Sequence, residues 1–407
     1  MIETVRSKKI LLLENIHPAA ANLLKSGGFN VEILSKALGE SEIIKAMTSD
    51  DYIALGVRSK TYLTLEVLEK IKNVSVVGAF CIGTNQINLS QGNKLGIPVF
   101  NAPYSSTRSV AELVIGEIIA LARRLFDVSK KAHEGLWDKS AKNCYTIRGK
   151  TLGIVGYGHI GSQVSVLAES MGLNVVYYDT IKTLPLGNSR ALTSLDELLK
   201  NSDFVTLHVP ETANTKNMIT KKQLLMMKPG SYLINASRGT VVVIEDLVSV
   251  LKSNHLHGAA VDVYPQEPES NDEKFKTELQ SLPNVILTPH IGGSTEEAQE
   301  AIGLEVAESM LRFLTLGSTY GAVNFPSIDV QPKKPSCQRI INVHQNVPGV
   351  LGEINSIVSK AGVNIESQQL ATDPQIGYLV MDFARGQIET MAKNISQLPT
   401  SIKTHVL

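Results

Sequence analysis

Three residues whose side chains could carry acid–base and anion-binding chemistry each follow an apolar run of the chain: Arg238, Glu267 and His290. If these runs are parallel strands, the three side chains stand at their carboxyl ends, the edge where open α/β sheets bind ligands. A neutral histidine can accept a hydroxyl proton, and a neighbouring carboxylate raises its pKa. An arginine can bind a carboxylate through two parallel hydrogen bonds and polarise a forming carbonyl. Singly, each residue fits a structural or surface role. Together they are the set that hydride removal from a 2-hydroxy acid requires.

A glycine motif in the middle of the chain, 156–161, predicts a dinucleotide site. It follows the apolar run 151–155 and precedes a predicted helix over 162–172. This strand–glycine–helix context favours a cofactor site over a simple glycine turn. Gly156 would allow the tight turn, Gly158 would let a pyrophosphate approach the backbone, and Gly161 would let the helix pack close to the strand. The first turn of the helix would offer free N–H groups to the phosphates.

The next apolar run, 175–178, ends in an acid, Asp179. A carboxylate at this position can accept hydrogen bonds from both hydroxyls of the adenosine ribose and would repel a 2′-phosphate. NAD is therefore favoured over NADP, although Lys182 follows three positions later. The alternative is a strand-end acid that faces solvent.

The composition describes an ordinary globular chain of two to three domains. It has 407 residues, 43% hydrophobic and 19% charged, with a formal net charge of +0, which argues against a nucleic-acid surface. Cys81, Cys144 and Cys337 form no C-x-x-C pair, which indicates a reducing compartment and no zinc or other metal framework. The first apolar run is short and ends at Glu14, so we expect a strand there rather than a signal peptide. With no segment long enough to span a membrane, we expect a cytoplasmic protein.

The order of apolar runs predicts an α/β fold with two Rossmann-like, doubly wound domains and a C-terminal α+β module. Residues 1–104 alternate strands and helices without a glycine motif, and residues 105–293 form the cofactor domain, entered by a long helix over 109–128. A helix over 296–316 would return the chain to the first domain, making that domain discontinuous (1–104 and 294–326). A proline-rich linker, 327–336, precedes a β-α-β-β-α-β module over 337–407.

On these segments the chain resembles the D-isomer-specific 2-hydroxyacid dehydrogenases. Residues 235–239, 262–268 and 288–293 match the family's three signature segments. The resemblance implies that Arg238 binds the substrate carboxylate, Glu267 is the partner acid and His290 is the acid/base. It also implies that NAD is bound, beside the three glycines, by His159, Ile160, Asp179, His208, Pro210, Ala236, Ser237, Arg238, Asp262, His290, Ile291, Gly292 and Gly293.

Within the family, segments 56–59, 80–85 and 101–112 resemble bacterial-type members that carry an ACT domain and oxidise 3-phospho-D-glycerate to 3-phosphohydroxypyruvate at the entry to L-serine synthesis. The resemblance implies substrate contacts from Arg58, Ser59, Ile82 and Gly83. Lys60 and Lys139 are candidate cations for the phosphate. The alternative, that both are solvated surface lysines without a ligand, is equally open. Lys139 stands beside Trp137, which in this subfamily reaches a neighbouring subunit. Ser106 occupies a position where asparagine is expected.

Segments 342–351 and 362–365 resemble the ACT module of serine-inhibited enzymes, and a homotetramer is expected. His344, Asn346 and Asn364 would bind L-serine between two modules, and Gly349 would place a helix N-terminus near its carboxylate. The alternative is polar strand-end residues without a ligand. The chain has Pro335, Ser336 and Cys337 where a glycine pair is expected as a hinge, which puts transmission of the serine signal in doubt.

Two other functions fit the same residues. One is a dehydrogenase for another small 2-hydroxy acid, such as glycerate or 2-hydroxyglutarate. The other is an NAD-sensing binding protein on the same fold. The intact set of Arg238, Glu267 and His290 favours an enzyme over a sensor.

Overall fold

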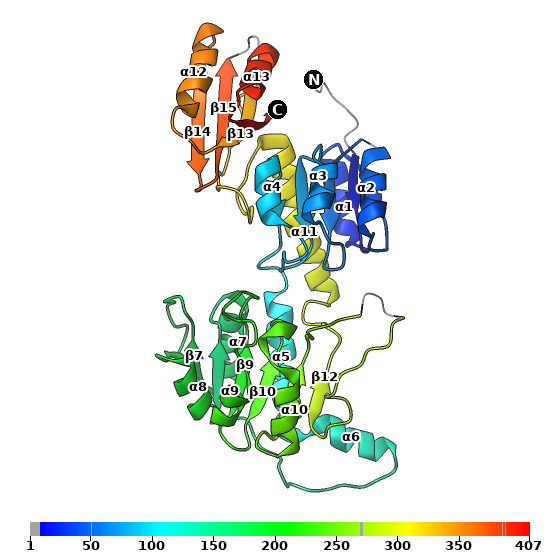
Figure 1. Ribbon diagram of the computed structural model, residues 1–407. Coiled ribbons are helices and arrows are strands. Elements are labelled where there is room, and N and C mark those ends of the chain that lie inside the picture. Colours follow the sequence, from blue (N-terminus) through cyan, green and yellow to red (C-terminus); the bar gives the residue numbers. More distant parts are fainter. Residues whose placement is uncertain (1–8, 50, 269–271, 385, 387) are drawn as a thin grey trace. The chain divides into compact units, whose positions relative to one another are not determined.

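The computed structural model describes residues 9–49, 51–268, 272–384, 386 and 388–407. The chain divides into two compact units, one formed by Met1–Ser105 with Gln299–Leu407 and the other by Ser106–Ala298. The predicted fold class is confirmed, because both units contain a parallel sheet and the C-terminal segment forms an antiparallel one (Figure 1). The predicted boundary at Gly293 precedes the division between the units, which falls inside a helix.

The parallel sheet of the first unit has the strand order β2-β1-β3-β4-β5. Apolar residues on both faces bury it between two groups of helices, as parallel sheets require. Helix α1 (Pro18–Ser26) covers one face, and α2 (Glu40–Ser49), α3 (Leu65–Lys70) and α4 (Leu89–Leu95) cover the other. The strands are β1 (Lys9–Leu12), β2 (Asn30–Ile33), β3 (Tyr52–Val57), β4 (Val76–Ala79) and β5 (Val99–Phe100).

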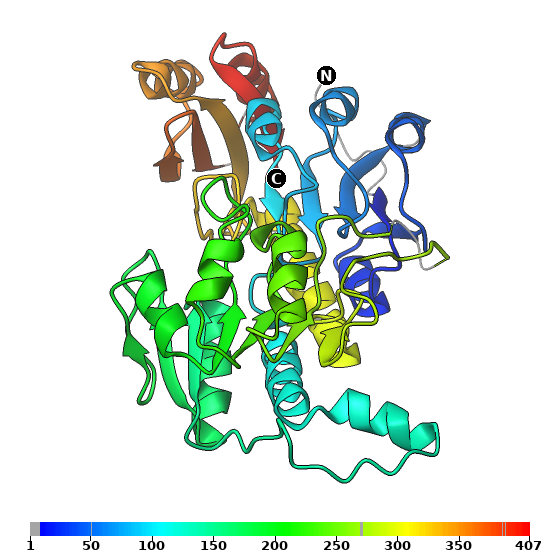
Figure 2. The same cartoon turned by 60° about the horizontal axis from the view of Figure 1, so that its bottom comes forward.

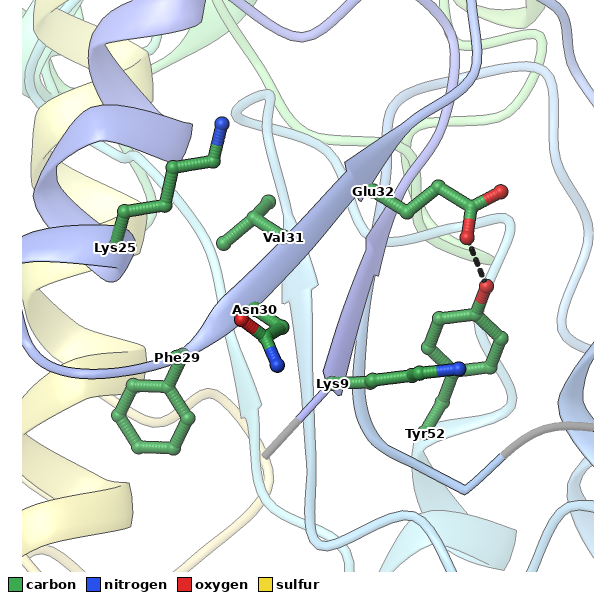
Figure 3. Close-up of a pocket in the computed structure, with 7 residues that line it drawn as sticks. All are labelled: Lys9, Lys25, Phe29, Asn30, Val31, Glu32 and Tyr52. Carbon is green, nitrogen blue, oxygen red and sulfur yellow. Dashed lines mark hydrogen bonds between the residues drawn. The ribbon is translucent and has the colours of Figure 1, made fainter. Parts of the chain in front are cut away.

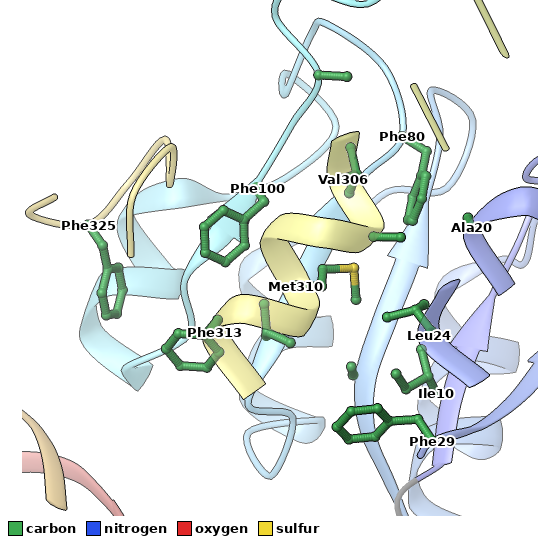
Figure 4. Close-up of a cluster of buried hydrophobic side chains, with 14 of the residues drawn as sticks. Ile10, Ala20, Leu24, Phe29, Phe80, Phe100, Val306, Met310, Phe313 and Phe325 are labelled. Atoms are coloured by element: carbon green, nitrogen blue, oxygen red, sulfur yellow. The ribbon is translucent and has the colours of Figure 1, made fainter. Parts of the chain in front are cut away.

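A long helix from the second half of the chain completes this core. Helix α11 has the predicted bounds, Glu296–Leu316. Its side chains Val306, Met310 and Phe313 are buried in one cluster with Phe80 and Phe100 (Figure 4). The first domain is therefore built from segments far apart in the sequence.

The parallel sheet of the second unit has the order β12-β11-β10-β9-β6-β7-β8. Helices α5 (Thr107–Arg123) and α7 (His159–Ser170) cover one face. Helices α8 (Leu195–Asn201), α9 (Lys221–Met226) and α10 (Ile244–Lys252) cover the other. The strands are β6 (Thr151–Val155), β7 (Asn174–Tyr178), β8 (Arg190–Ala191), β9 (Phe204–Leu207), β10 (Tyr232–Asn235), β11 (Gly258–Val261) and β12 (Val285–Leu287), and a short 3-10 turn, η1 (Gly239–Val241), follows β10.

The single helix predicted over 109–128 is wrong. Arg124 adopts a left-handed conformation, with φ of 50°, which ends α5 and starts a separate helix, α6 (Leu125–His133). Helix α6 buries none of its side chains, and with the following segment it extends away from the sheet of its own unit (Figure 2). Phe126 and Trp137 leave large apolar side chains exposed on this extension.

The C-terminal sheet is antiparallel, with the order β14-β15-β13-β16. Its strands are β13 (Cys337–Gln345), β14 (Ile365–Thr372), β15 (Ile376–Ala384) and β16 (Ser401–Val406). Helices α12 (Val350–Lys360) and α13 (Ile388–Ser396) cover one face. These elements follow the predicted β-α-β-β-α-β order.

The other face of the C-terminal sheet packs on the end of α11 and the segment after it. The Tyr378 hydroxyl donates to the Gly317 carbonyl at 2.7 Å. The buried Arg339 guanidinium binds both oxygens of Asp382, at 2.6 and 2.7 Å, and donates to the Leu316 carbonyl at 2.8 Å. Ile328, inside the predicted linker, is only 6% exposed in the same cluster. The beginning of that linker is therefore part of a packed core.

Candidate active site

His290 and Glu267 form a hydrogen-bonded pair beyond the carboxyl ends of β12 and β11. The Nδ1 atom of His290 lies 2.9 Å from Oε2 of Glu267. The other oxygen of Glu267 accepts the Tyr264 backbone N–H at 3.2 Å, which orients the carboxylate. With Nδ1–H donated to the carboxylate, Nε2 is the atom of the imidazole left to accept a proton.

The contact between the two groups shifts the pKa of each from its ordinary value. The hydrogen bond that His290 donates to Glu267 raises the pKa of His290, against the opposing effect of burial. Burial opposes ionisation of Glu267, yet the hydrogen bond and charge of His290 hold the pKa of that carboxyl below its usual value. The positive charge of Arg238 acts on both groups, lowering the pKa of each. The structure therefore brings these predicted residues into one electrostatic cluster.

Asp262 holds the loop that carries His290. Its carboxylate accepts the Thr288 hydroxyl at 2.7 Å and the backbone N–H groups of Ile291 and Gly292 at 2.8 and 2.9 Å. His290 itself has φ of 55°, a left-handed conformation that costs a non-glycine residue energy and is found at functional sites. The three hydrogen bonds to Asp262 stabilise that backbone and so fix the direction of the imidazole.

Arg238 follows β10 in a loop that lies against the Glu267 segment. The Asn235 side chain accepts from the Ser237 backbone N–H and hydroxyl and donates to the Arg238 carbonyl, which closes the turn. A side chain at Gly239 would meet the Tyr264 carbonyl carbon at 1.9 Å. Only glycine therefore allows this close approach of the two loops, and the approach sets Arg238 beside Glu267 and His290.

The glycine motif begins α7 earlier than predicted, at His159 rather than at residue 162. Gly161 lies in the first turn of this helix, so close to the turn after β6 that a Cβ would meet the Gly156 carbonyl oxygen at 2.2 Å. Gly158 and His159 are exposed at this helix end. The unpaired N–H groups and dipole of a helix N-terminus fit a pyrophosphate.

Asp179 is oriented for a ribose. One oxygen accepts the Tyr157 backbone N–H at 2.7 Å and the other accepts the Ile181 N–H at 2.9 Å. Each carboxylate oxygen keeps acceptor capacity for a ribose hydroxyl. The aromatic ring of Tyr157 stacks on Tyr177 at 3.7 Å, which stabilises the turn beneath. The residues at this position therefore fit NAD.

The remaining predicted cofactor residues stand at neighbouring strand ends. His208 follows β9, bonds the Thr206 hydroxyl at 2.9 Å, and is kept neutral by burial, which lowers its pKa to about 3. Its carbonyl lies against Gly156. Pro210 is exposed on the same segment, whereas Ala236 and Ser237 are buried after β10. Gly293, the last residue of the motif that carries His290, is partly buried.

In the first unit, the predicted substrate residues lie at the carboxyl ends of β3 and β4, which pair side by side. Arg58, Ser59 and Lys60 follow β3, and Ile82 and Gly83 follow β4. The Asn101 amide donates to the Ile82 carbonyl at 2.6 Å, which holds the second segment. The structure brings these segments together, as the resemblance implies.

Lys139 belongs to the second unit. It lies in the exposed segment after α6, and α6 itself is tied through Asp127 to the backbone N–H of Asn284, at the amino end of β12. That end of the sheet is opposite the one that carries His290. Lys139 therefore follows a helix tied to the amino ends of the strands, whereas His290 lies at their carboxyl ends.

The effector candidates fall at two ends of the C-terminal sheet. His344 pairs with Gly377, is 3% exposed and bonds Asn342 at 3.0 Å, and burial lowers its pKa. Asn346 follows at the same end, whereas the Asn364 carbonyl accepts from Ala384 at the other end of β15. One chain therefore cannot assemble all three side chains into one site.

Sequence reasoning missed three residues that shape these sites: Glu14, Gln86 and Glu117. Glu14 and Gln86 hold the loop of Arg58 by hydrogen bonds. Glu117 lies on α5, is 4% exposed, has no hydrogen-bond partner on either oxygen among the described residues, and is close enough to Asp262 to feel its charge. Burial raises the pKa of Glu117 to about 8. For Glu117 the sequence offered one signal, an acidic residue within the apolar pattern of a helix. For Glu14 and Gln86 no local sequence pattern indicated a role.

A shallow pocket of about 420 Å³ lies elsewhere, at the edge of the first sheet (Figure 3). There the Tyr52 hydroxyl donates to Glu32 at 2.5 Å. None of the candidate site residues is among its lining, which is Lys9, Lys25, Phe29, Asn30, Val31, Glu32 and Tyr52. Across the described part of the chain, no group of three or more His, Cys, Asp or Glu side chains is arranged to hold a metal, and no helix is both long and apolar enough to cross a bilayer.

Comparisons with known proteins agree with this geometry. Residues 115–292 match the family model of the D-isomer specific 2-hydroxyacid dehydrogenase NAD binding domain, and residues 340–403 match an AHAS small subunit-like ACT domain. The chain is 53% identical to a D-3-phosphoglycerate dehydrogenase of Dictyostelium discoideum over 98% of its length and 97% of the relative's. It is 48% identical to D-3-phosphoglycerate dehydrogenase 1 of Saccharomyces cerevisiae, over 98% and 87%. A D-lactate dehydrogenase from Aquifex aeolicus, solved with NAD and lactic acid, matches with a TM-score of 0.66 at 29% identity, covering 75% of this chain and 95% of that one.

Proposed function

The chain belongs to the D-isomer-specific 2-hydroxyacid dehydrogenase family, and we propose that it oxidises 3-phospho-D-glycerate to 3-phosphohydroxypyruvate with NAD, the first step of L-serine synthesis. The observation that carries this proposal is the His290–Glu267 pair held at 2.9 Å beside Arg238, in a chain whose full-length relatives bear that enzyme name.

The chemistry follows from the residues of the cluster. Nε2 of His290 accepts the proton of the substrate hydroxyl, and Glu267 stabilises the imidazolium that forms. Arg238 binds the substrate carboxylate and polarises the new carbonyl. NAD, when bound, accepts the hydride from the substrate carbon. Asp179 and the N-terminus of α7 hold the adenosine ribose and the pyrophosphate, and Asp262 keeps the His290 loop in place.

The phosphate of the substrate is bound in the first unit. Arg58 and Lys60 supply the positive charge, and Ser59 and the backbone at Ile82 and Gly83 supply further polar contacts. Arginine and lysine both bind phosphate well, the first through its planar fork and the second as a point charge.

A second chain supplies what one chain lacks. Trp137, 90% exposed, and Phe126 on the α6 extension give an apolar surface that a partner subunit covers, carrying Lys139 to that partner. Asn364 of one ACT domain meets His344 and Asn346 of another, forming an L-serine site between modules. Two such contacts per chain build a homotetramer. The three cysteines are free thiols, which supports a cytoplasmic location.

A phosphate-free 2-hydroxy acid is the alternative substrate, since Arg238, Glu267 and His290 would treat glycerate in the same way. An NAD-sensing binding protein is the alternative outside catalysis, and it would bind NAD without turnover.

The testing experiment is the initial rate of NADH formation with 3-phospho-D-glycerate, with and without L-serine. Turnover that serine suppresses supports both the active site and the ACT effector site. Turnover that serine leaves unchanged supports the proposed enzyme activity and excludes serine as its effector. No turnover on this acid, with turnover on glycerate or 2-hydroxyglutarate, moves the assignment to those substrates. NAD binding without any turnover favours the sensor.

A further inference from the structure

Glu14 carries a buried carboxylate that accepts hydrogen bonds from main-chain donors. The residue is 9% exposed and follows β1. Its Oε1 accepts the backbone N–H groups of Arg58 and Thr61 at 3.0 and 2.9 Å, and its Oε2 accepts that of Lys60 at 3.0 Å. Three charge-assisted hydrogen bonds therefore converge on one side chain from one short loop.

The backbone around Glu14 is built to aim this carboxylate. Glu14 and Asn15 both adopt left-handed conformations, with φ of 60° and 53°, which non-glycine residues rarely do in succession. Their N–H groups donate to the Lys36 and Leu34 carbonyls at 3.2 and 3.3 Å, which stabilises the turn. Strained backbone that its surroundings hold in place is typical of functional sites.

A second buried side chain fixes the same loop from the other side. The amide of Gln86, 7% exposed, donates to the Arg58 carbonyl at 2.5 Å and lies 3.4 Å from the Gly83 carbonyl. Gln86 therefore links the loop after β3 to the loop after β4. These are the two loops that carry the proposed substrate contacts.

We propose that Glu14 is a positioning residue for the substrate phosphate: by binding three backbone N–H groups of loop 58–61, it orders the loop that carries Arg58, Ser59 and Lys60 before the ligand arrives. The inference rests on the proposed function. Ordering a loop in advance removes an entropic cost from binding, so Glu14 acts on substrate affinity rather than on the chemical step.

The test compares steady-state kinetics of wild type and Glu14→Gln. The variant keeps the shape but turns one acceptor into an NH2 group that faces a backbone N–H. We expect KM for 3-phospho-D-glycerate to rise at least tenfold, with kcat and the Kd for NAD within twofold of wild type. Gln86→Met, which removes the second hydrogen-bonding side chain, should also raise KM. Because both residues act on one loop, the fold-increase in KM of the double variant should be smaller than the product of the two single fold-increases.

Glu42→Gln is the matched control. Glu42 also accepts a backbone N–H, that of Gly39 at 3.0 Å, but it is an exposed carboxylate bonded to Lys36. Its KM should match wild type.

An unchanged KM in Glu14→Gln and Gln86→Met overturns the proposal. Loss of NAD affinity together with the rise in KM also overturns it, because the residue then supports the fold in general. Absence of wild-type turnover on this acid overturns both this role and the proposed function, whereas wild-type turnover with an unchanged variant KM overturns this role alone.

Discussion

The buried carboxyl of Glu117 should make this protein lose stability as pH rises, and replacing it should remove that loss. Burial raises the pKa of Glu117 from 4.5 to about 8 in the folded chain, with the nearby charge of Asp262 adding to the effect. A folded-state pKa above the unfolded value means that the folded chain binds the proton more tightly. The contribution of this carboxyl to stability is therefore fully present below pH 4.5 and is lost as pH rises from 4.5 toward 8.

The size of this loss of folding stability follows from the rule that a pKa shift of one unit corresponds to about 1.36 kcal/mol. Between an unfolded pKa of 4.5 and a folded pKa of about 8, the penalty on folding is about 1 kcal/mol at pH 5 and about 4 kcal/mol at pH 8. Glu117→Met keeps the volume and removes both unpartnered oxygens. Its stability relative to wild type should therefore improve by about 3 kcal/mol between pH 5 and pH 8. For a domain of this size that corresponds to roughly 6–12 °C in Tm.

The assay is thermal unfolding of both proteins at pH 5 and pH 8, with the difference in Tm as the readout. Groups that titrate equally in both proteins cancel in that difference. Glu112→Met is the control, because Glu112 lies on the same helix but is exposed and pairs with Arg108. Its Tm difference from wild type should not depend on pH. A Glu117→Met difference that stays constant from pH 5 to pH 8 would refute the reasoning.

Other substitutions test the site and the C-terminal docking. His290→Ala should lower kcat about 10²–10⁴-fold and spare NAD binding, and retained turnover would contradict the acid/base role. In Glu267→Gln the pKa of His290 should fall, so the rise of kcat/KM with pH for oxidation should move to lower pH, and an unmoved profile would count against the pair. Asp179→Ala should weaken NAD binding roughly 10–100-fold by loss of hydrogen bonds to a charged group, and an unchanged ratio of NAD to NADP affinity would exclude its ribose role. Arg339→Met leaves the partly buried Asp382 without its partner and should cost about 3–5 kcal/mol. Hydrogen exchange in β13 and β15 measures this loss, and unchanged protection would contradict the prediction.

Much of the fold and of the dehydrogenase cluster could be predicted from the chain because the signals are local. A strand, a glycine turn and a helix follow one another over about twenty residues of the motif that ends in Asp179. Hydrophobic periodicity marks strands and helices within short windows. Arg238, Glu267 and His290 each sit at a fixed offset from such a strand, so parallel pairing alone places them at one edge. Their precise roles stay predictions that the substitutions above will test.

Conformations set by single residues were harder to predict. The break at Arg124 and the early start of α7 at His159 depend on a left-handed residue and on a close backbone contact. The residues on both sides of Arg124 remain helical in pattern, so the periodicity does not show the break. The start of α7 falls inside the glycine motif, where hydrophobic periodicity gives no signal.

By itself, the sequence determined the fold class, the family and the order of the elements, since these follow from patterns between near neighbours along the chain. Only the tertiary structure decided that Glu14 reaches a loop more than forty positions away, that Glu117 is buried beside Asp262, and that Asn364 lies at the far end of the sheet from His344. Each of these depends on which strands pair, in which order and direction. Strand pairing joins residues distant in the chain, and no local pattern encodes that choice.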